Sequence, residues 1–265
     1  MNSTASHALR FLGVGNAQAV ELGSAAVVLE RDGEPLLLID CGQEALSAYL
    51  QRYGEVPMAL FITHAHLDHV AGLERLFYRV LFDAQRCGRV RIYAAADLVP
   101  VLQHRIAGYP SPLAEGGANF WDAFQLVPVA HGFWHAGLWF DVFAVRHHAP
   151  RTAFGIALRG SFLYSGDTRP IPEAVALHAD AGEWIAHDCA LQGNPSHTGL
   201  DDLMREYPQE LRDRMIVYHY SKDSDRDAFT AAGLRVAVAG EALALAPPMD
   251  AMAACARAQH GGRAA

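Results

Sequence analysis

One stretch of the chain, FITHAHLDHVAGLE at residues 61–74, limits the fold more than any other. It begins as an apolar run, and His64, His66, Asp68 and His69 then follow within six positions. Imidazoles and carboxylates packed this closely would desolvate and repel one another unless a shared ligand held them together. These residue types are the ones that bind metal ions. The fold must therefore place this segment where other parts of the chain can complete a metal site.

The residues on either side predict a strand before the cluster and a helix after it. Ala59–Thr63 is a short apolar run typical of a buried strand, and the apolar spacing over Val70–Leu81 indicates an amphipathic helix. The cluster then occupies the turn at the carboxyl end of the strand, where the loops of α/β folds converge on sites. The first two histidines can point to one ion, and the Asp–His pair one turn later to a neighbouring ion.

Two ions need more ligands than one turn supplies, and later predicted strands end at suitable residues. They are Trp139–Arg146 before His147 and His148, Phe162–Ser165 before Asp167, and Met215–Tyr218 before His219. A single histidine after a strand is more often structural than a ligand. Together, however, these residues form one pattern, with a ligand at the end of each strand.

The order of the predicted elements indicates an α/β fold. The remaining strands are Phe11–Val14, Ala25–Glu30, Leu36–Asp40, Val90–Ala94, Phe154–Arg159 and Trp184–His187. The remaining helices are Gln43–Arg52, Asp97–Ala107, Pro172–Ala179 and Leu200–Glu206. Groups of strands with interleaved helices favour packed sheets with helices outside. We expect residues 1–245 of the 265 to form a single domain and the Ala-rich residues 246–265 to form a tail.

The net charge and the spacing of the cysteines limit which binding partners and which cellular compartment we expect. The net charge is −8 and Lys222 is the one lysine, whereas binding to large nucleic acids needs a positive surface that displaces counterions. The four cysteines are widely spaced without a C-x-x-C motif, which favours free thiols in a reducing cytoplasm. We find no signal peptide in the first ten residues and no apolar run near the roughly 18 residues of a membrane span. A cytoplasmic protein with no membrane partner is expected.

Residues 106–145 contain no Lys or Arg and carry Trp121, Trp134 and Trp139 together with several Phe. One interpretation is core plus a packed loop. The other is an apolar lid or wall over a pocket. A homodimer interface is a third role for the same apolar surface, so the oligomeric state stays open.

The motif H-x-H-x-D-H, followed along the chain by His, Asp and His, resembles the metallo-β-lactamase fold superfamily. The resemblance covers roughly residues 10–245 and includes the opening segment FLGVGNAQAVELGSAAVVLERDGEPLLLIDCG at residues 11–42. It implies a four-layer αββα sandwich, in which two mixed β-sheets pack together between outer helices. It also implies that Asp40 is a buried group that supports the metal loop from beneath.

The resemblance further implies a ligand set for two divalent metal ions. The first ion would be bound by His64, His66 and either His147 or His148, the second by Asp68, His69 and His219, and Asp167 would bridge both. Pro150 favours His147 as the third ligand of the first ion, whereas the spacing to Gly155 favours His148, so both remain candidates. Aspartate at position 167 and the Asp–His pair at 68–69 imply zinc, with Mn or Fe as alternatives, in hydrolysis rather than redox chemistry.

A second segment, WIAHDCALQGNPSHTGLDDL at residues 184–203, resembles ribonuclease Z and related phosphodiesterases. The resemblance implies that His197, oriented by Asp188, is a general acid that protonates the leaving oxygen of a phosphodiester. In the structural alternative, Asp188 caps a turn and His197 lies beside the start of the next helix. Asp68, His197 and Asp188 are therefore the candidate catalytic residues.

The chain also departs from ribonuclease Z, which carries a long basic arm that grips transfer RNA. The middle region here lacks Lys and Arg, so a small ester, a cyclic nucleotide or a similar metabolite is the expected substrate. Arg151 and Arg169 lie next to candidate ligands and are either contacts for an anionic substrate or surface charges.

The expected function is that of a dinuclear metal-dependent hydrolase, a phosphodiesterase that uses a metal-bound hydroxide. One alternative is a thioesterase or lactonase on the same fold, with an apolar pocket supplied by residues 120–143. Another is a metal-binding protein with little turnover.

Overall fold

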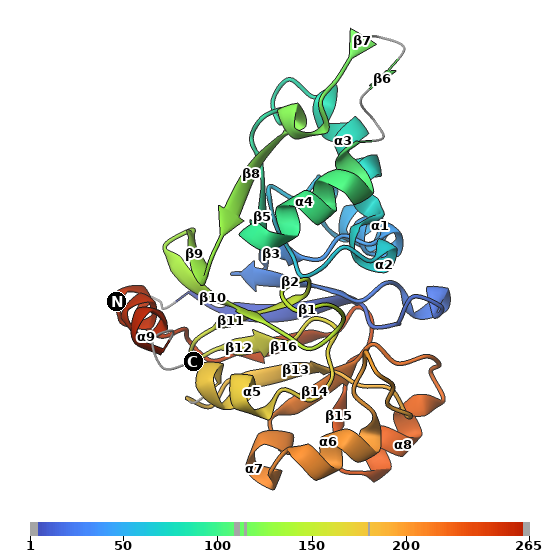
Figure 1. Ribbon diagram of the computed structural model, residues 1–265, viewed down its shortest axis with the longest axis vertical. Coiled ribbons are helices and arrows are strands. Elements are labelled where there is room, and N and C mark those ends of the chain that lie inside the picture. Colours follow the sequence, from blue (N-terminus) through green and yellow to red (C-terminus); the bar gives the residue numbers. More distant parts are fainter. Residues whose placement is uncertain (1–4, 109–111, 114–115, 180, 262–265) are drawn as a thin grey trace.

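A computed structural model describes residues 5–108, 112–113, 116–179 and 181–261 (Figure 1). In these residues the strands form two seven-stranded sheets and one two-stranded ribbon, β6 (Pro112–Leu113) with β7 (Gly116–Gly117). The two large sheets lie against each other, with one group of helices above and another below (Figure 1). This is the four-layer αββα sandwich of two mixed sheets that the resemblance to the metallo-β-lactamase fold superfamily implies.

The first sheet has the strand order β16-β1-β2-β3-β4-β5-β8. The bounds are β1 His7–Gly13, β2 Ala26–Arg31, β3 Glu34–Ile39, β4 Ala59–Ile62, β5 Val90–Ala95, β8 Phe124–Val129 and β16 Ala242–Leu245. Strands β16 to β3 pair antiparallel, and strands β3 to β8 pair parallel. The parallel half directs the carboxyl ends of β3, β4 and β5 to one edge of the sheet, where the histidine-rich segment begins.

The second sheet has the order β15-β14-β13-β12-β11-β10-β9 and repeats the same plan. The bounds are β9 Gly132–His135, β10 Leu138–Ala144, β11 Phe154–Leu158, β12 Phe162–Tyr164, β13 Trp184–Asp188, β14 Met215–Tyr218 and β15 Arg235–Val236. Strands β9 to β12 pair antiparallel, and β12 to β15 pair parallel. Parallel strands therefore end together in this sheet as well.

Helices α1 (Gln43–Tyr53), α2 (Leu67–Val70), α3 (Gly72–Leu81) and α4 (Val99–Leu102) belong to the upper group in Figure 1. Helices α5 (Pro172–His178), α6 (Leu200–Glu206), α7 (Gln209–Arg212) and α8 (Asp225–Ala231) belong to the lower group. Helix α9 (Ala251–Gly261) lies to one side, against β10. No helix among the described residues is both long and apolar enough to cross a membrane.

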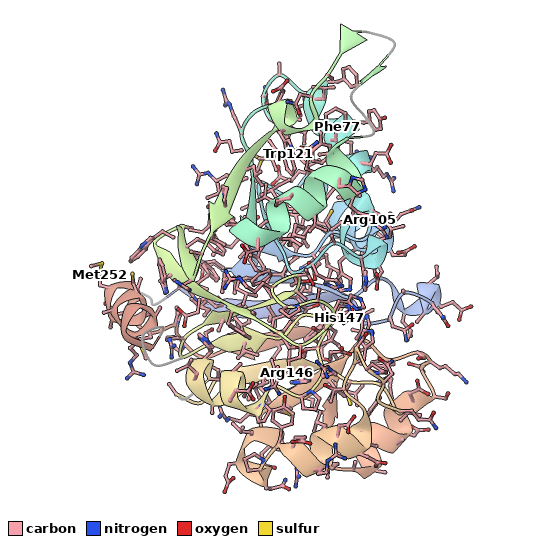
Figure 2. All side chains as sticks on the ribbon, in the orientation of Figure 1. Phe77, Arg105, Trp121, Arg146, His147 and Met252 are labelled. Atoms are coloured by element: carbon pink, nitrogen blue, oxygen red, sulfur yellow. The ribbon has the colours of Figure 1, made fainter. Side chains whose placement is uncertain are left out.

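Apolar periodicity explains how the helices attach to the sheets. Leu73, Leu76, Phe77 and Val80 form the buried side of α3 at a spacing of three or four residues. The Phe77 ring stacks on Phe120, with centroids 5.3 Å apart, and Figure 2 shows Phe77 close to Trp121 in the upper part of the molecule. Such packing stabilises the helix because an isolated helix of ten residues is marginal in water.

The two sheets are joined by a run of aromatic side chains. Phe133 of β9 stacks on Tyr93 of β5 with centroids 4.1 Å apart, and on Phe140 of β10 with centroids 5.1 Å apart. The ring of Phe61 in β4 also stacks on Phe133, with centroids 5.9 Å apart. The strand that carries the histidine-rich segment is therefore packed directly against the second sheet.

Residues 106–145 differ most from the expectation of a packed loop or lid. Residues 124–129 are the edge strand β8 of the first sheet, and residues 132–135 are the edge strand β9 of the second. Both were missed because edge strands are only partly buried and β8 contains Pro128, which weakens the strand pattern. Residues 109–111 and 114–115 lie outside the described part of the chain.

Candidate metal centre

The histidine-rich segment changes from an extended to a helical backbone at His66. Strand β4 ends at Ile62, and His66 is still extended, with φ −70° and ψ 151°. Helix α2 begins at the next residue, and the Val70 N–H donates to the His66 carbonyl at 3.0 Å. The change of backbone sends the first two histidines in one direction and the Asp68–His69 pair in another.

Close backbone packing fixes this segment against the turn after β3. The Cys41 N–H donates to the His69 carbonyl at 2.7 Å, and the Gly72 N–H donates to the Cys41 carbonyl at 2.9 Å. A Cβ atom at Gly72 would lie 2.6 Å from the Gly42 carbonyl oxygen. Glycine is therefore required at position 72, because any side chain there would push α2 and α3 away from the site.

The second sheet supplies the other candidate ligands from the ends of its strands. His147 follows β10, Asp167 follows β12, and His219 comes directly after β14. His219 has a left-handed backbone, with φ 70°, and its N–H donates to the Val14 carbonyl at 2.7 Å. Since Val14 follows β1 of the first sheet, this bond brings the ends of the two sheets together at the site.

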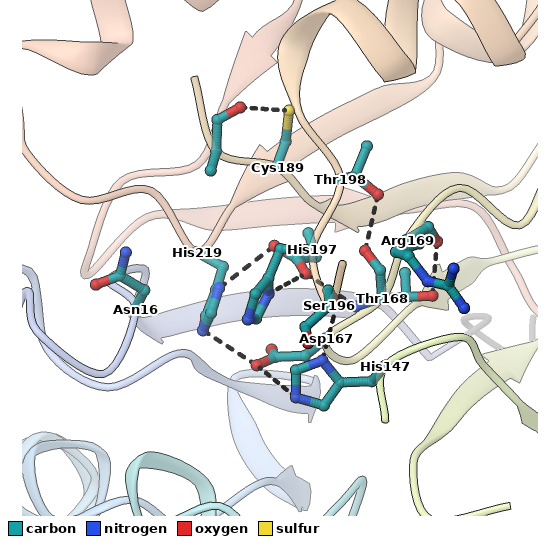
Figure 3. A network of polar contacts seen from close by, with 12 residues as sticks. Asn16, His147, Asp167, Thr168, Arg169, Cys189, Ser196, His197, Thr198 and His219 are labelled. Carbon is teal, nitrogen blue, oxygen red and sulfur yellow. Dashed lines mark hydrogen bonds and ion pairs between the residues drawn. The ribbon is translucent and has the colours of Figure 1, made fainter. Parts of the chain in front are cut away.

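The first cluster consists of His64, His66, His147 and Asp167, whose ligand atoms lie within 4.8 Å of one another. The Nε2 atoms of His64 and His147 lie 3.6 and 3.8 Å from Asp167 Oδ2. His147 Nε2 also lies 3.2 Å from His66 Nδ1. Figure 3 shows His147 and Asp167 pointing toward each other.

The second cluster consists of Asp68, His69, Asp167 and His219, again with all ligand atoms within 4.8 Å. The Nε2 atoms of His69 and His219 lie 3.4 and 3.2 Å from Asp167 Oδ2. The same two nitrogens lie 3.3 and 3.6 Å from Asp68 Oδ2. Asp167 belongs to both clusters, which is the position that a bridging carboxylate would occupy.

Within the described part of the chain, each cluster contains buried polar atoms that have no hydrogen-bond partner. Among the described residues these atoms include the Nε2 atoms of His64, His69 and His219, and Oδ1 of Asp167. Buried polar atoms are normally paired because leaving one unpaired costs about 1–3 kcal/mol. The three nitrogens lie 3.2–3.6 Å from Asp167 Oδ2, and bound cations would satisfy them. The residues present therefore suit metal binding.

The far side of each second-cluster imidazole is held by a buried carboxylate. His69 Nδ1 lies 2.8 Å from Asp40 Oδ2, and Asp40 also accepts hydrogen bonds from the Thr63 N–H and hydroxyl, both at 2.8 Å. His219 Nδ1 lies 3.3 Å from Asp188 Oδ1. Such contacts fix the orientation of the ring and raise the basicity of the nitrogen that would face a metal.

The electrostatics of the centre favour a cation. Burial lowers the pKa of His219, but the negative charges of Asp167 and Asp188 more than offset burial and raise that pKa to about 10. Burial likewise opposes the charged form of His69, yet Asp167 and Asp40 hold its pKa well above the ordinary value. The carboxylates thus attract protons to these imidazoles, and a divalent ion would compete with those protons.

The structure separates His147 from His148, which the sequence leaves as alternatives. His147 is buried, and its Nδ1 hydrogen-bonds the Ser196 carbonyl at 2.9 Å, so its Nε2 faces the first cluster. His148 is exposed and contacts the outer side of His66, with 2.8 Å between the two Nε2 atoms. The geometry favours His147 as the candidate ligand and places His148 behind His66.

A carboxylate–imidazole pair adjoins both clusters. His197 Nδ1 lies 2.8 Å from Oδ2 of the wholly buried Asp188, and Figure 3 shows His197 between His219 and Ser196. Asp188 also accepts a hydrogen bond from the Thr168 N–H at 2.8 Å. Burial lowers the pKa of His197, but the hydrogen bond and charge of Asp188 outweigh burial, and the pKa lies above its ordinary value.

A cavity of about 350 Å³ opens over the clusters. Its floor is formed by His66, Asp68, Asp167, His197 and His219. Its walls are formed by Asn16, Ala17, Gln18, Ala190, Gln192, Asn194 and Ser221. The sequence gives no particular signal for these wall residues, because an exposed amide in a loop has no pattern of its own.

Two expectations about the surroundings of the site change. None of the described residues in the segment 106–145 lines this cavity, so the apolar stretch does not form its wall. Neither Arg151 nor Arg169 lines it either. Arg151 forms an ion pair with Asp97, and Arg169 is exposed with its Nε 3.4 Å from the Arg146 carbonyl, so both are surface charges in this structure.

Comparison with known sequences gives a consistent set of relatives. The sequence profile of a family described as "Anti-Pycsar protein Apyc1" matches residues 7–242. Proteins with that description from Paenibacillus harenae and Saccharibacillus brassicae are 28% and 30% identical, each over 82% of this chain and 91% of the relative. A ribonuclease Z from Deinococcus radiodurans is 28% identical over 45% of this chain and 35% of that protein.

Solved structures with the same fold have low sequence identity. A diphosphatase of the PhnP family has a TM-score of 0.73 at 20% identity, over 92% of this chain and 99% of the other. The metallo-β-lactamase fold protein YhfI from Bacillus subtilis has a TM-score of 0.68 at 12% identity, over 90% and 99%. The short form of human tRNase Z has a TM-score of 0.60 at 18% identity, over 91% and 100%. The chain therefore has the metallo-β-lactamase fold.

Proposed function

The chain belongs to the anti-Pycsar protein Apyc1 family, and from this membership and the geometry of its centre we propose that it is a dinuclear metal-dependent phosphodiesterase acting on a small substrate. The observation that carries the proposal is the contact between the buried Asp188 and the half-buried His197 beside two clusters that share Asp167. This arrangement combines a place for metal ions with a proton donor for a leaving group.

The two clusters would hold one divalent ion each. His64, His66 and His147 would bind the first ion. Asp68, His69 and His219 would bind the second ion, and Asp167 would contact both. Mixed imidazole and carboxylate ligands suit zinc, with Mn or Fe as alternatives. When bound, such a pair of ions supplies activation of a water molecule and offsets the negative charge that develops on phosphoryl oxygens.

His197 is proposed to protonate the leaving oxygen. Its Nδ1 is engaged by Asp188 at 2.8 Å, so the proton available for transfer is on Nε2. Burial disfavours the charged ring, but the hydrogen bond that Asp188 accepts from His197 Nδ1–H, together with the charge of Asp188, raises the pKa of His197 above its ordinary value. The shift favours the protonated form of His197 that a general acid needs.

The size and charge of the site favour a small phosphodiester such as a cyclic nucleotide. A cavity of about 350 Å³ is large enough for a small molecule, and a chain with a net charge of −8 lacks the positive surface that a long nucleic acid needs. The thioesterase or lactonase alternative loses its main support, because the aromatic residues 120–143 do not line this cavity.

The test is hydrolysis of two phosphodiesters by the zinc-loaded protein and by His197→Ala. Bis-p-nitrophenyl phosphate has a good leaving group that needs little protonation, whereas a 3′,5′-cyclic nucleotide releases an alkoxide. We expect the wild-type protein to hydrolyse both, and His197→Ala to lower turnover of the cyclic nucleotide by about 10²–10⁴-fold. The same variant should lose less turnover with bis-p-nitrophenyl phosphate than with the cyclic nucleotide.

His104→Ala is the matched control, because His104 is an exposed histidine that does not line the cavity. It should leave both rates unchanged. Hydrolysis of thioesters or lactones with neither phosphodiester cleaved would reject the proposal. So would metal binding without turnover of any ester.

A further inference from the structure

A second cavity, of about 240 Å³, lies apart from the metal centre. It is bordered by strand β10, by strand β11 with the residue after it, by the end of α5 and by α9. Among the described residues, none lines both this cavity and the one over the metal clusters. Figure 2 shows Met252 of α9 at the left edge of the molecule and His147 of the metal centre to the right of the middle. The second cavity therefore needs an explanation of its own.

The charged side chains that face this cavity are all basic. Within the part of the chain that the structure describes, its lining includes Arg151, Arg159 and Arg257 but no Asp or Glu. The whole chain has 21 Lys and Arg against 29 Asp and Glu. A lining with three arginines and no acid thus runs against the composition of the protein, and it favours an anion as the occupant.

Arg159 is the buried member of the three and is held in position from behind. Its Nε lies 2.7 Å from Asp141 Oδ2, and its Nη1 donates to the Leu177 carbonyl at 3.0 Å. The other carboxylate oxygen, Asp141 Oδ1, accepts from Trp139 Nε1 at 2.7 Å. The side chains of Arg159 and Asp141 are 4% and 0% exposed. Since Asp141 does not line the cavity, the pair presents its arginine and not its carboxylate to a ligand.

The other two arginines are exposed at the edge of the cavity. Arg151 forms an ion pair with Asp97, and this acid also lies outside the lining. Arg257 belongs to α9, which packs against β10 and is anchored by the buried Ala254. The cationic groups therefore come from three separate elements and meet at one cavity, with the nearby acids turned away from it.

Most of the remaining lining is apolar. Val142, Phe143 and Phe154 line the cavity and are buried in the protein. The Phe143 ring stacks on His178, with centroids 4.5 Å apart, so this wall is also rigid. An inorganic anion would leave the apolar wall unused, and a neutral apolar molecule would leave the arginines unused. Apolar walls with a few well-placed polar groups are typical of small-molecule sites.

We propose that this cavity is a binding site for a small organic monoanion with an apolar body, such as a carboxylate of medium chain length. Arginine suits the anionic end, because its planar guanidinium matches a carboxylate with two parallel hydrogen bonds. The apolar body would be removed from water against Phe143 and Phe154. The site does not depend on the proposed phosphodiesterase function, since it shares no described lining residue with the metal cavity.

The experiment is calorimetric titration of the zinc-loaded protein with octanoate, 1-octanol and acetate. Octanol keeps the chain without the charge, and acetate keeps the charge without the chain. We expect one octanoate per protein chain, with each of the other two compounds binding at least about tenfold more weakly. Ala144→Trp should abolish octanoate binding, because Ala144 is an exposed lining residue of β10 and an indole there would fill the cavity.

Two further variants test the arginines without disturbing the buried pair. Arg151→Met and Arg257→Met change exposed side chains and should each weaken octanoate binding about threefold, and about tenfold together. Ala244→Trp and Arg105→Met are the matched controls, because Ala244 and Arg105 are exposed residues that do not line this cavity. Both controls should keep the wild-type affinity.

Three results would overturn the inference. The first is no binding of octanoate by the wild-type protein up to about 10 mM. The second is equal affinity for octanoate and octanol, or unchanged affinity in the double arginine variant, because the arginines would then not recognise the anion. The third is unchanged binding in Ala144→Trp, which would place octanoate elsewhere, for example on the metal ions.

Discussion

The two clusters share Asp167 but are supported differently. Behind the second cluster stand two wholly buried carboxylates, with Asp40 contacting His69 and Asp188 contacting His219. Behind the first cluster stand a backbone carbonyl, a hydroxyl and an imidazole. His147 contacts the Ser196 carbonyl, His64 Nδ1 lies 3.0 Å from the Thr63 hydroxyl, and His66 contacts the exposed His148.

This difference separates the roles of the two clusters. A metal ion in the second cluster would be surrounded by the charges of Asp68 and Asp167, with Asp40 and Asp188 behind them, whereas the first cluster has only the shared Asp167. Opposite charge stabilises a buried cation more strongly than neutral dipoles do. The second cluster should therefore bind its ion more tightly, and through Asp188 it is also connected to the proton donor His197.

The largest effect is expected where the clusters meet. Asp167→Asn keeps the shape of the side chain but removes the charge that both clusters share. We expect the metal content of the purified protein to fall from two ions per chain to fewer than one. Turnover should fall about a thousandfold or more, equal to about 4 kcal/mol of activation free energy. Elemental analysis and the phosphodiester assay measure the two losses, and two retained ions would contradict a bridging role.

The next effect tests the link between the second cluster and His197. Asp188→Asn removes the charge that raises the pKa of His197 against the effect of burial. The protonated donor is present below the pKa of His197 and is lost as the pH rises through it. Lowering that pKa should therefore move the alkaline limb of the pH–kcat profile to lower pH. At neutral pH, turnover of a cyclic nucleotide should fall about a hundredfold.

His178→Asn is the comparison for this profile, since His178 lines a different cavity and contacts a different buried carboxylate, Asp141, at 3.0 Å. The alkaline limb should stay in place in that variant. If Asp188→Asn lowers kcat equally at every pH, Asp188 acts on the metal centre through His219 and not on the proton donor.

A smaller effect is expected from the buried support of His69. Asp40→Asn leaves at least one of the three donors around Asp40 without an acceptor, which should lower Tm by about 5–10 °C. Affinity for the second ion should fall about 10–100-fold. Asp32→Asn is a matched control, because Asp32 has a similar left-handed backbone, φ 53° against 64° at Asp40, but is exposed. Equal changes in Tm for the two variants would contradict a specific role for Asp40.

The sequence alone predicts the parts of this centre that follow regular elements. The spacing of His64, His66, Asp68 and His69 after an apolar strand indicates their grouping, because a strand end and a helix start have few local geometries. The parallel halves of both sheets explain why ligands from distant segments such as His219 meet there. The order of the predicted elements indicates packed sheets with outer helices, whereas the four-layer sandwich was implied by the resemblance to the metallo-β-lactamase fold superfamily.

The remaining features depend on contacts that no local pattern encodes. His147 and His148 are neighbours in the irregular turn after β10. There the Ser196 carbonyl accepts a hydrogen bond from His147. The side-chain amides of Asn16 and Asn194 form hydrogen bonds within the loops that border the cavity, which no local sequence pattern predicts. These differences depend on tertiary contacts, so the three-dimensional structure is needed to identify them.

The smallest effect should come from His148, and it decides between the two neighbouring histidines. If His66 binds a metal through Nδ1, its Nε2–H donates to Nε2 of His148, whose Nδ1 faces Ser196 Oγ at 3.4 Å. His148→Ala should then weaken affinity for the first ion by about tenfold, and His148→Gln should restore part of it because its carbonyl oxygen can accept the same proton. His147→Ala should remove the first ion altogether. Loss of that ion in His148→Ala but not in His147→Ala would reverse the assignment, since removal of a ligand costs more affinity than removal of a residue that supports one.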